Sequence, residues 1–507
     1  MQRRPRRARE PAKLGAAWLG RGPLRNALPP VTPLSADQVE AIHEASLKIL
    51  EEIGIEFQGA AACEMFRKAG AMVEVNSGLT RIPRELVMQA LKTAPESFTL
   101  TPRNPARALN VGGNHIAFSL VAGPPNVHDC VKGRRSGNHA DYVSLIKLAQ
   151  SFDIIHFIGN QPTAPQELPV RTRHLDCYLA NVRYSDRVFH TTAIGRERAL
   201  DGIDMMAISR GLTREQLAQH PGVLTVISVN SPRRFDGPMS DGLMAMAEYN
   251  QAVVVTPFTL MGAMAPVSLA AALTQQNAEA LAGITLSQLT RPGSPVVYGA
   301  FTSDVDMKSG APAFGTPENA RATLACGQLA RFYKLPYRAS NSSASNAVDA
   351  QAAYESQMSI WSSAMAHANL VYHGAGWMEG GLTASFEKIV LDVEMLQMMA
   401  ETIQPFAVAP EDIALDAIAS VPPGGHFFGA AHTLERYETA FYRPLLSDWR
   451  AYESWQIDGA KDATQRATAI WQQALERYEQ PPLDPAIQEA LDAHAAKRKE
   501  TLRDVDH

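Results

Sequence analysis

The chain has 507 residues, 46% of them hydrophobic and 20% charged, a globular composition large enough for one extended domain or for two domains. Its net charge of −5 provides neither a basic field for a nucleic acid nor a charged surface for a membrane. The four cysteines form no CxxC pair, which argues against a disulfide framework or a thiolate zinc site and is typical of a cytoplasmic protein.

The first 34 residues open with the arginine-rich stretch MQRRPRRARE and are expected to form a flexible basic tail. The apolar run LGAAWLG that follows is too short for the core of a signal peptide. No other apolar run approaches the roughly 20 residues that a membrane helix needs. The alternative to a disordered tail is an arm for export or docking.

Residues 35–114 are expected to form a helical extension in front of the main domain. The stretch 35–54 begins at the potential capping residue Ser35, ends at Gly54, and has apolar residues at helical spacing. The residues of that apolar face are Val39, Ile42, Leu47, Leu50 and Ile53. A second helix is expected over 83–94.

From residue 115 to about 404, eight short apolar or β-branched runs alternate with helical patterns. The runs cover residues 115–123, 154–162, 187–195, 222–232, 252–260, 295–303, 335–340 and 370–376. The helical patterns cover 167–181, 196–211, 238–250, 267–290, 317–333, 348–367 and 383–403. Short runs that are apolar throughout are typical of parallel strands buried on both faces.

This alternation predicts an α/β fold, a (β/α)8 TIM barrel over 115–404. Residues 405–507 are expected to form a C-terminal segment of loops and helices that covers the barrel. An open doubly wound sheet is the alternative fold, although its usual GxGxxG fingerprint follows none of the early strands.

In a (β/α)8 barrel, functional residues lie at the C-terminal ends of the strands. His128, His190 and His373 follow different strands there, as barrel metal ligands do, although ordinary hydrogen bonding at strand ends explains them equally well. No spacing indicates a nucleophile elbow, a phosphate loop or an HExxH metal site. No tightly bound metal is therefore expected.

Aromatic residues gather in or beside the same strand-end loops, namely Phe301, Phe314, Tyr354, Trp361, Trp377, Phe386, Phe427 and Phe428. A cation held over one ring face gains about 0.5–2 kcal/mol. Several such rings around one cavity would suit a quaternary ammonium ligand. Packing in the hydrophobic core is the alternative explanation for these residues.

Three longer segments carry a family resemblance: MGAMAPVSLAAALTQQNAEALAGITLSQLTRPGSPVVYG (261–299), DAQAAYESQMSIWSSAMAHANLVYHGAGWMEGGLTASFEKIVLDVEML (349–396) and GGHFFGAAHT (424–433). The chain resembles the trimethylamine methyltransferase (MttB-type) family of corrinoid-dependent methyltransferases from about residue 35 to 480. The resemblance implies a (β/α)8 barrel whose mouth accepts cobalamin from a separate corrinoid protein.

Trimethylamine-specific members of the family carry pyrrolysine near the end of the seventh strand. This chain has only standard residues in the corresponding LPYRASNSSASNAVDAQ. It therefore resembles the non-pyrrolysine branch, whose members demethylate quaternary amines such as glycine betaine. The expected reaction moves a methyl group from a betaine to Co(I) and needs no general acid, because the amine leaves as a neutral molecule.

The resemblance also suggests which residues meet the corrinoid. His373, in the matching VYHGAG, is the candidate catalytic residue and a contact for the cobalt or the upper corrinoid face. Gly374 and Gly376 would let the macrocycle approach the backbone closely. The segment GGHFFGAAHT would fold back over the mouth, so that His426 and Phe427 contact the corrinoid edge.

The candidates for the substrate lie around the same mouth. The ammonium group is expected against Phe301, Phe314, Tyr354 and Trp377. The substrate carboxylate is expected on Arg338 or Asn341, since guanidinium matches a planar carboxylate. Glu379 is a candidate to balance the cation, with a solvated loop position as the alternative.

Two other functions are compatible with the residues. One is a metal-dependent barrel hydrolase or lyase that uses His128, His190 and His373. The other is a non-catalytic protein that binds a betaine. A homo-oligomer is expected whichever function the protein has, because a barrel with an apolar C-terminal extension favours self-association.

Overall fold

The computed structural model describes residues 23–503. Residues 1–22, which make up most of the predicted basic tail, lie outside this range. Within the described range, every helix is too short or too polar to cross a membrane.

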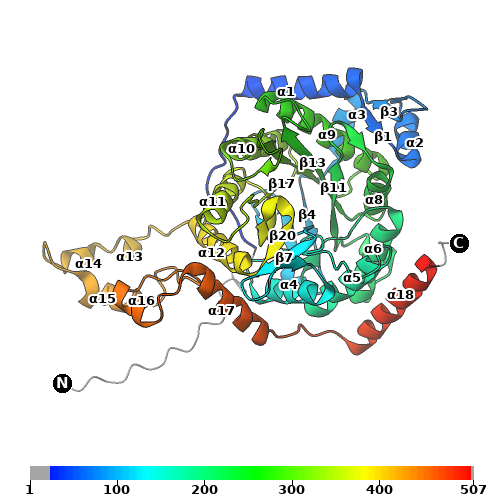
Figure 1. The fold of residues 1–507 in the computed structure, drawn as a ribbon. Coiled ribbons are helices and arrows are strands. Elements are labelled where there is room, and N and C mark those ends of the chain that lie inside the picture. The colour runs from blue at the N-terminus through cyan, green and yellow to red at the C-terminus, as the bar shows by residue number, and fades with distance from the viewer. Residues whose placement is uncertain (1–22, 504–507) are drawn as a thin grey trace.

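Eight parallel strands form a closed barrel (Figure 1). They are β6 (Ala117–Leu120), β9 (Phe157–Ile158), β10 (Val188–Phe189), β11 (Leu224–Val229), β13 (Ala252–Met261), β14 (Val296–Gly299), β17 (Tyr337–Ser340) and β18 (Leu370–Ala375). Neighbouring strands pair in order around the ring, β18 pairs back to β6, and a parallel bridge between His190 and Leu224 joins β10 to β11. Each of the eight predicted runs contains one of these strands, so the barrel prediction is confirmed.

Helices surround the barrel on its outer side (Figure 1). The helices between successive strands are α4 (His139–Ser151), α5 (Arg173–Tyr184), α6 (Arg196–Ser209), α7 (Arg214–Leu217), α8 (Gly237–Glu248), α9 (Leu269–Thr290), α10 (Pro317–Phe332) and α11 (Ala350–Met365), and α12 (Phe386–Thr402) follows the last strand. The sequence patterns predicted seven of these nine helices and missed the short α7 and the longer α4. Its start was visible as Asn138, whose side chain accepts a hydrogen bond from the Asp141 amide.

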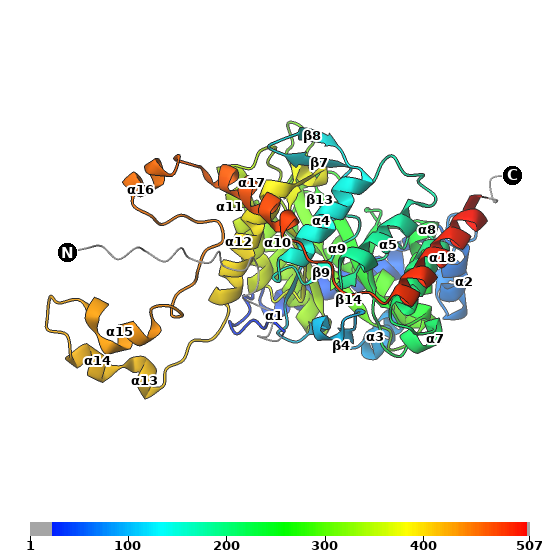
Figure 2. The same cartoon turned by 90° about the horizontal axis from the view of Figure 1, so that it is seen from below.

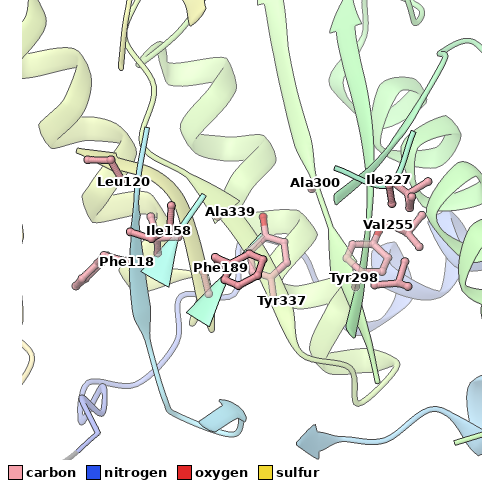
Figure 3. Packing of buried hydrophobic residues seen from close by; sticks show 14 of the residues in the cluster. Phe118, Leu120, Ile158, Phe189, Ile227, Val255, Tyr298, Ala300, Tyr337 and Ala339 are labelled. Atoms are coloured by element: carbon pink, nitrogen blue, oxygen red, sulfur yellow. The ribbon is translucent and has the colours of Figure 1, made fainter. Parts of the chain in front are cut away.

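Strand alternation separates an outer core from an inner one. Along β14, Val296 and Tyr298 pack outward against the helices, whereas Val297 points into the barrel. Figure 3 shows residues of the outer core, among them Phe118, Phe189 and Val255. The same alternation directs every second side chain of each strand into the barrel.

The inner core closes the N-terminal end of the barrel. It contains Phe157, Leu224 and Val254 from the strands, together with Leu100 and Val111. The last two lie on the hairpin of β4 (Ser97–Leu100) and β5 (Leu109–Gly112). Figure 2 shows β4 at one end of the barrel and β7 with β8 at the other. The interior is therefore filled at the N-terminal end.

A small sheet lies at the C-terminal end of the barrel. Its order is β19-β20-β7-β8, with β7 (Asn126–Asp129) and β8 (Gly133–Ser136) from the loop after β6 and with β19 (Trp377–Met378) and β20 (Thr383–Ser385) from the loop after β18. Parallel pairing of β7 with β20 joins the two loops. This sheet fixes the loops beside the open end of the barrel.

The N-terminal region contains the expected helices α1 (Ala36–Lys48) and α3 (Arg84–Thr93), with α2 (Ala60–Lys68) between them. Ser35 and Gln38 form a capping box at the start of α1. Ile53 is 49% exposed instead of joining the apolar face, because residues 49–53 form a turn of π-helix and its wider spacing rotates Ile53 away.

Short strands accompany these helices in the N-terminal region. They are β1 (Ile55–Phe57), β2 (Met72–Val73) and β3 (Leu79–Arg81), in addition to the β4–β5 hairpin. The first of them pairs with β12 (Arg234–Phe235), which lies in the loop after β11. This pairing ties the N-terminal region to the barrel.

The C-terminal region divides into an arm and two packed helices. Residues 404–461, here called the C-terminal arm, project away from the barrel (Figures 1 and 2), except for residues 442–447, which donate hydrogen bonds to Glu394 on α12. The arm carries α13 (Pro410–Ile413), α14 (Leu415–Ala419), α15 (Ala431–Arg436) and α16 (Tyr452–Ile457). The following α17 (Ala463–Glu476) packs on α12 and α4, and α18 (Pro485–Arg503) packs on α5 and α6.

Candidate functional site

A cavity of about 240 Å³ occupies the C-terminal half of the barrel interior. Its lining residues come from all eight strands or the loops that follow them, with Met239 from α8, and none of them is an Asp or a Glu. They are Ala122, Gly123, Asn160, His190, Thr192, Ala193, Ile194, Val226, Ser228, Met239, Thr256, Phe258, Phe301, Arg338, Tyr372 and His373.

Arg338 supplies the positive charge of this cavity. Strand alternation turns its side chain inward from β17, and the residue is only 2% exposed. Its guanidinium donates to the Ala300 carbonyl at 3.1 Å and lies over the rings of Tyr372 and Phe301, 4.8 and 5.3 Å from their centroids. Burial lowers the pKa of Arg338 to about 10, so the group stays charged at neutral pH.

No carboxylate balances this charge among residues 23–503. Within the described chain, the side chain of Arg338 donates to the Ala300 carbonyl and lies beside the rings of Phe301, Tyr372 and His373, and its Nε atom is buried without a partner. A buried charge is costly unless it is paired. The cavity is therefore arranged to receive an anion.

His373 enters the cavity because β18 is irregular. Regular alternation would point its side chain outward, since Tyr372 already points inward. The register of β18 against β6 shifts between Val371 and Ala375, and His373 has a φ of +56°. Its Nδ1 accepts from the Ala122 amide at 3.2 Å, and its Nε2 lies 3.4 Å from Nη2 of Arg338. Burial, and then the charge of Arg338, holds the pKa of His373 well below its ordinary value.

His190 approaches the same region from β10. Its Nε2 accepts from the Val226 amide at 2.5 Å, and its Nδ1 is buried without a partner. Burial, followed by the charge of Arg338, lowers the pKa of His190 to about 3. Both cavity histidines are therefore neutral at physiological pH.

Aromatic rings form the wall beyond Arg338. Phe301 stacks on Phe314 with centroids 5.2 Å apart and makes an edge contact with Trp377 at 6.0 Å. Trp377 also contacts His373, with centroids 4.0 Å apart. Phe258 lies 5.1 Å from Phe301 on the other side. The sequence-predicted rings Phe301, Phe314 and Trp377 are thus brought together, and of these Phe301 lines the cavity.

Three other predicted substrate residues lie outside the cavity. Tyr354 is on α11 and is 62% exposed. Asn341 donates from Nδ2 to the Gly374 carbonyl at 2.9 Å, so it supports the turn after β18. The carboxylate of Glu379 accepts from Arg134 at 2.9 Å.

Internal packing explains the two predicted glycines. A Cβ on Gly374 would lie 2.7 Å from the Ser119 carbonyl oxygen of β6. A Cβ on Gly376, whose φ is +103°, would lie 2.7 Å from the Ile389 side chain of α12. The close approach at both positions is to neighbouring elements of the same chain.

His426 and Phe427 lie on the C-terminal arm and not over the barrel mouth. The ring of His426 contacts Phe428, with centroids 5.5 Å apart, and Phe428 is 82% exposed. The expectation that GGHFFGAAHT folds back over the mouth is therefore corrected. Its glycines and aromatic residues resemble a site by composition, but the arm leads them away from the barrel (Figure 2).

A buried ion pair holds the turn that carries His373. Lys388 and Asp392 on α12 are both 0% exposed, with Nζ 2.5 Å from Oδ1. Lys388 also donates to Ser356 on α11 at 2.6 Å, and Asp392 accepts from the Gly376 amide at 2.8 Å. The pair therefore connects two outer helices to the end of β18.

The histidines proposed for a metal site are not grouped for one. His128 lies on β7 of the small sheet, whereas His190 and His373 each commit one ring nitrogen to a backbone amide. Within residues 23–503, the group with metal-ligand spacing is Glu40, His43 and Glu44 on α1.

Some inward-facing cavity residues were not selected from the sequence, because the alternation of side chains along each strand was not applied. Sequence reasoning considered His190 only as a possible metal ligand, and it did not select Thr256, Phe258 or Tyr372 for the site. All four line the cavity. Counting every second residue along the runs 187–195, 252–260 and 370–376 would have identified these inward faces, because Val188, Val254 and Leu370 of the inner core share them.

A family model described as trimethylamine methyltransferase (MTTB) matches residues 2–503. The chain belongs to the trimethylamine methyltransferase (MttB) family. It is thus a methyltransferase, and its barrel cavity is the candidate active site of an MttB-family enzyme.

Named methyltransferases with similar sequences support this membership. This MttB-family chain is 39% identical over 472 residues to glycine betaine methyltransferase of Desulfitobacterium hafniense (strain Y51), covering 93% of this chain and 98% of that protein. It is 30% identical over 465 residues to trimethylamine methyltransferase MttB of Desulfitobacterium hafniense (strain DSM 10664 / DCB-2), covering 90% and 92%.

Solved structures support the fold. Monomethylamine methyltransferase (MtmB) of Methanosarcina barkeri superposes with a TM-score of 0.51 at 10% sequence identity, covering 89% of this chain and 90% of that one. A hydroxylamine complex of MtmB gives the same TM-score and covers 89% of each chain. At this identity the likeness concerns the architecture alone.

Proposed function

We propose that this MttB-family enzyme transfers a methyl group from a betaine, glycine betaine or a close analogue, to the Co(I) of a corrinoid carried by a separate protein. The observation that carries the proposal is the buried guanidinium of Arg338, which faces the cavity and has no carboxylate partner within residues 23–503. A betaine provides that carboxylate and a quaternary ammonium in one small molecule. The likeness to a glycine betaine methyltransferase supports the same substrate class.

The exposed fractions along the cavity orient the substrate. Arg338 and Tyr372 are 2% and 1% exposed, whereas Ile194 at the other end is 44% exposed. A carboxylate on Arg338 therefore leaves the ammonium group toward solvent. Phe258 and Phe301 lie on that side, and their rings attract a cation. Phe314 and Trp377 pack behind Phe301 and hold its ring in place.

This orientation suits transfer from a quaternary amine. The methyl carbon leaves nitrogen, the electron pair of the C–N bond stays on nitrogen, and the product is a neutral tertiary amine that requires no proton donor. The reduced corrinoid supplies the two-electron nucleophile. The chain's task is to fix the C–N bond toward the opening and to exclude water from it. Trimethylamine lacks both the permanent charge and the carboxylate.

The open end of the cavity has room for a planar group. Gly123 lines the cavity with a φ of +97°, and a Cβ placed on it would meet nothing within 4 Å. His373, Gly374 and Gly376 lie at the end of β18 on the same side of the barrel. We propose that the corrinoid protein docks over this opening. The four cysteines are all free, which fits a reducing cytoplasm as the site of the reaction.

The test is anaerobic incubation of the enzyme with chemically reduced cobalamin and a panel of amines. We expect glycine betaine or a related betaine to convert the Co(I) absorbance to that of methyl-Co(III), and choline and trimethylamine to convert it at least tenfold more slowly. Arg338→Met is expected to remove the conversion. Conversion with trimethylamine but with none of the betaines would contradict the proposal. So would the absence of conversion with every amine of the panel, while a control methyltransferase converts its own substrate.

We also infer that the enzyme self-associates through its C-terminal arm. Exposed large apolar side chains are concentrated there, namely Phe406, Val408, Ile413, Leu415, Ile418, Phe427, Phe428, Leu434, Tyr437, Phe441, Trp449, Tyr452 and Ile457. A second copy would cover such a surface permanently, whereas a corrinoid protein that exchanges during turnover would not. Sedimentation velocity should then give a species heavier than the 55.1 kDa chain.

A further inference from the structure

The two cavity histidines are held in a defined protonation state by the backbone. The Ala122 amide donates to Nδ1 of His373, and the Val226 amide donates to Nε2 of His190. A backbone N–H is always a donor, so the ring nitrogen that accepts it carries no proton. In a neutral imidazole the proton then sits on the other nitrogen, which is Nε2 in His373 and Nδ1 in His190.

Both protonated nitrogens lack an acceptor in the cavity. Nδ1 of His190 is buried without a partner. Nε2 of His373 lies 3.4 Å from Nη2 of Arg338, so two N–H groups face each other there. A buried donor without an acceptor is unfavourable, and two that converge on one place are more so.

An anion relieves this arrangement. Arg338, His190 and His373 all line the cavity, and the charge of Arg338 acts on both rings. The cavity lining contains no carboxylate that could accept from them. One planar carboxylate has two oxygens with about four acceptor positions, enough for a guanidinium and two imidazole N–H groups.

We propose that Nδ1–H of His190, Nε2–H of His373 and the guanidinium of Arg338 form one carboxylate-binding subsite, in which both histidines act as neutral donors. The inference rests on the proposed function for the choice of a betaine as the ligand. It goes further by naming the donors and by making the carboxylate, and not only the ammonium, the group that selects the substrate. It also gives His373 a role on the substrate.

Neutral donors make binding independent of pH over a wide range. Burial, together with the charge of Arg338, lowers the pKa of His190 to about 3 and holds the pKa of His373 well below its ordinary value. His190 also acts on His373, and Tyr372 packs beside both rings. His190 does not titrate between pH 5.5 and 8.5, and Arg338, with a pKa of about 10, keeps its charge there.

Two substitutions remove the imidazole N–H that faces the cavity and keep an acceptor for the backbone amide. In His190→Gln, the side-chain oxygen can replace Nε2 as the acceptor for the Val226 amide. In His373→Asn, the oxygen can replace Nδ1 for the Ala122 amide, and asparagine tolerates the positive φ of +56° at this position.

His156 offers a matched control. Its Nδ1 accepts from the Phe118 amide at 3.0 Å, and burial lowers its pKa to about 3, as for His190. It does not line the cavity. His156→Asn therefore keeps the same kind of backbone contact and changes no donor of the proposed subsite.

The experiment is calorimetric titration of the full-length wild type and the three variants with glycine betaine and with choline, from pH 5.5 to 8.5. We expect His190→Gln and His373→Asn each to weaken betaine binding about ten- to a hundredfold. Choline, which has no carboxylate, should bind wild type and variants equally weakly. His156→Asn should bind betaine as the wild type does, and the wild-type affinity should be constant with pH.

Unchanged betaine affinity in both folded variants would overturn the inference, as would affinity that rises as pH falls through about 6.5, which requires protonated histidine. Nitrogen-15 spectra of the wild-type histidines report the two tautomers without any variant, and the opposite tautomers would also overturn it. Carboxylate-selective binding without methyl transfer would leave the subsite standing and remove the proposed function. Methyl transfer by the wild type, together with unchanged betaine affinity in both variants, would leave the proposed function standing and remove the subsite.

Discussion

At the scale of single residues, the cavity is defined by a charge that the fold does not need. Arg338 is buried without a counter-ion in the described chain, whereas the equally buried Arg187 lies 3.5 Å from the carboxylate of Asp153. Functional sites are commonly built at a cost in stability. The two arginines therefore allow the functional and the structural roles of a buried charge to be compared in one protein.

Arg338→Met should stabilise the free enzyme by about 1–2 kcal/mol, because it removes an unpaired buried charge and keeps most of the apolar volume. Arg187→Met should destabilise it by about 1–3 kcal/mol, because the carbonyls of Gln150 and Phe152 lose their donor and Asp153 keeps only Arg107 as a counter-ion. Denaturant unfolding at constant m-value measures both changes. A clear loss of stability in Arg338→Met would show that the charge has a structural role and weaken the case for a ligand site.

Sequence reasoning at this scale found Arg338, Phe301 and His373 but missed partners on the same inward faces. A strand-end list treats every polar residue alike, whereas alternation decides which ones share an interior. The position of His373 was not predictable by alternation, because a register shift turns it inward. The prediction that GGHFFGAAHT covers the barrel mouth was wrong, because the composition of a segment does not show where in the fold the chain places it.

At the scale of elements, the last strand and its following helix form one unit. Asp392 on α12 accepts from the Gly376 amide, and Asn341 after β17 donates to the Gly374 carbonyl. These contacts fix the turn directly after His373. The buried partner of Asp392 is Lys388, so the orientation of His373 depends on an ion pair that contacts no substrate.

Asp392→Asn should destabilise the enzyme by about 3–5 kcal/mol, because it leaves Lys388 charged and buried without a counter-ion. The double variant Asp392→Asn with Lys388→Met should recover at least half of that loss. A double-mutant cycle followed by denaturant unfolding gives the coupling. The matched control is the surface pair Lys48 and Glu52, whose side chains are 67% and 63% exposed and whose removal should cost less than about 0.5 kcal/mol. If the losses of stability in the two single variants simply add in the double variant, the buried ion pair does not couple Lys388 to Asp392 and the proposed role is contradicted.

The elements themselves were largely predictable. Parallel strands buried on both faces leave continuous apolar runs, and each of the eight runs contains a barrel strand. The short strands β7, β8, β19 and β20 were not predicted, because they pair across two loops that are distant in sequence. Their burial depends on tertiary contacts that no local pattern reveals.

At the scale of the whole molecule, the enzyme has one plugged end, one open end and a lateral arm. The β4–β5 hairpin and the inner core close the N-terminal end, so the cavity communicates with solvent at the other. The direction of the C-terminal arm could not be predicted, because an amphipathic pattern shows that a face needs a partner without showing which one. The open end and the arm are separate surfaces (Figure 2), which allows a corrinoid protein and a second copy to bind together.

The most direct test of the central claim is a crystal structure of the enzyme with glycine betaine bound. We predict the carboxylate within hydrogen-bond distance of Arg338, His190 and His373, and the trimethylammonium group beside Phe258 and Phe301 with one methyl toward the opening. A carboxylate at the opening with the ammonium group buried near Arg338, or a betaine bound outside the barrel, would contradict the account.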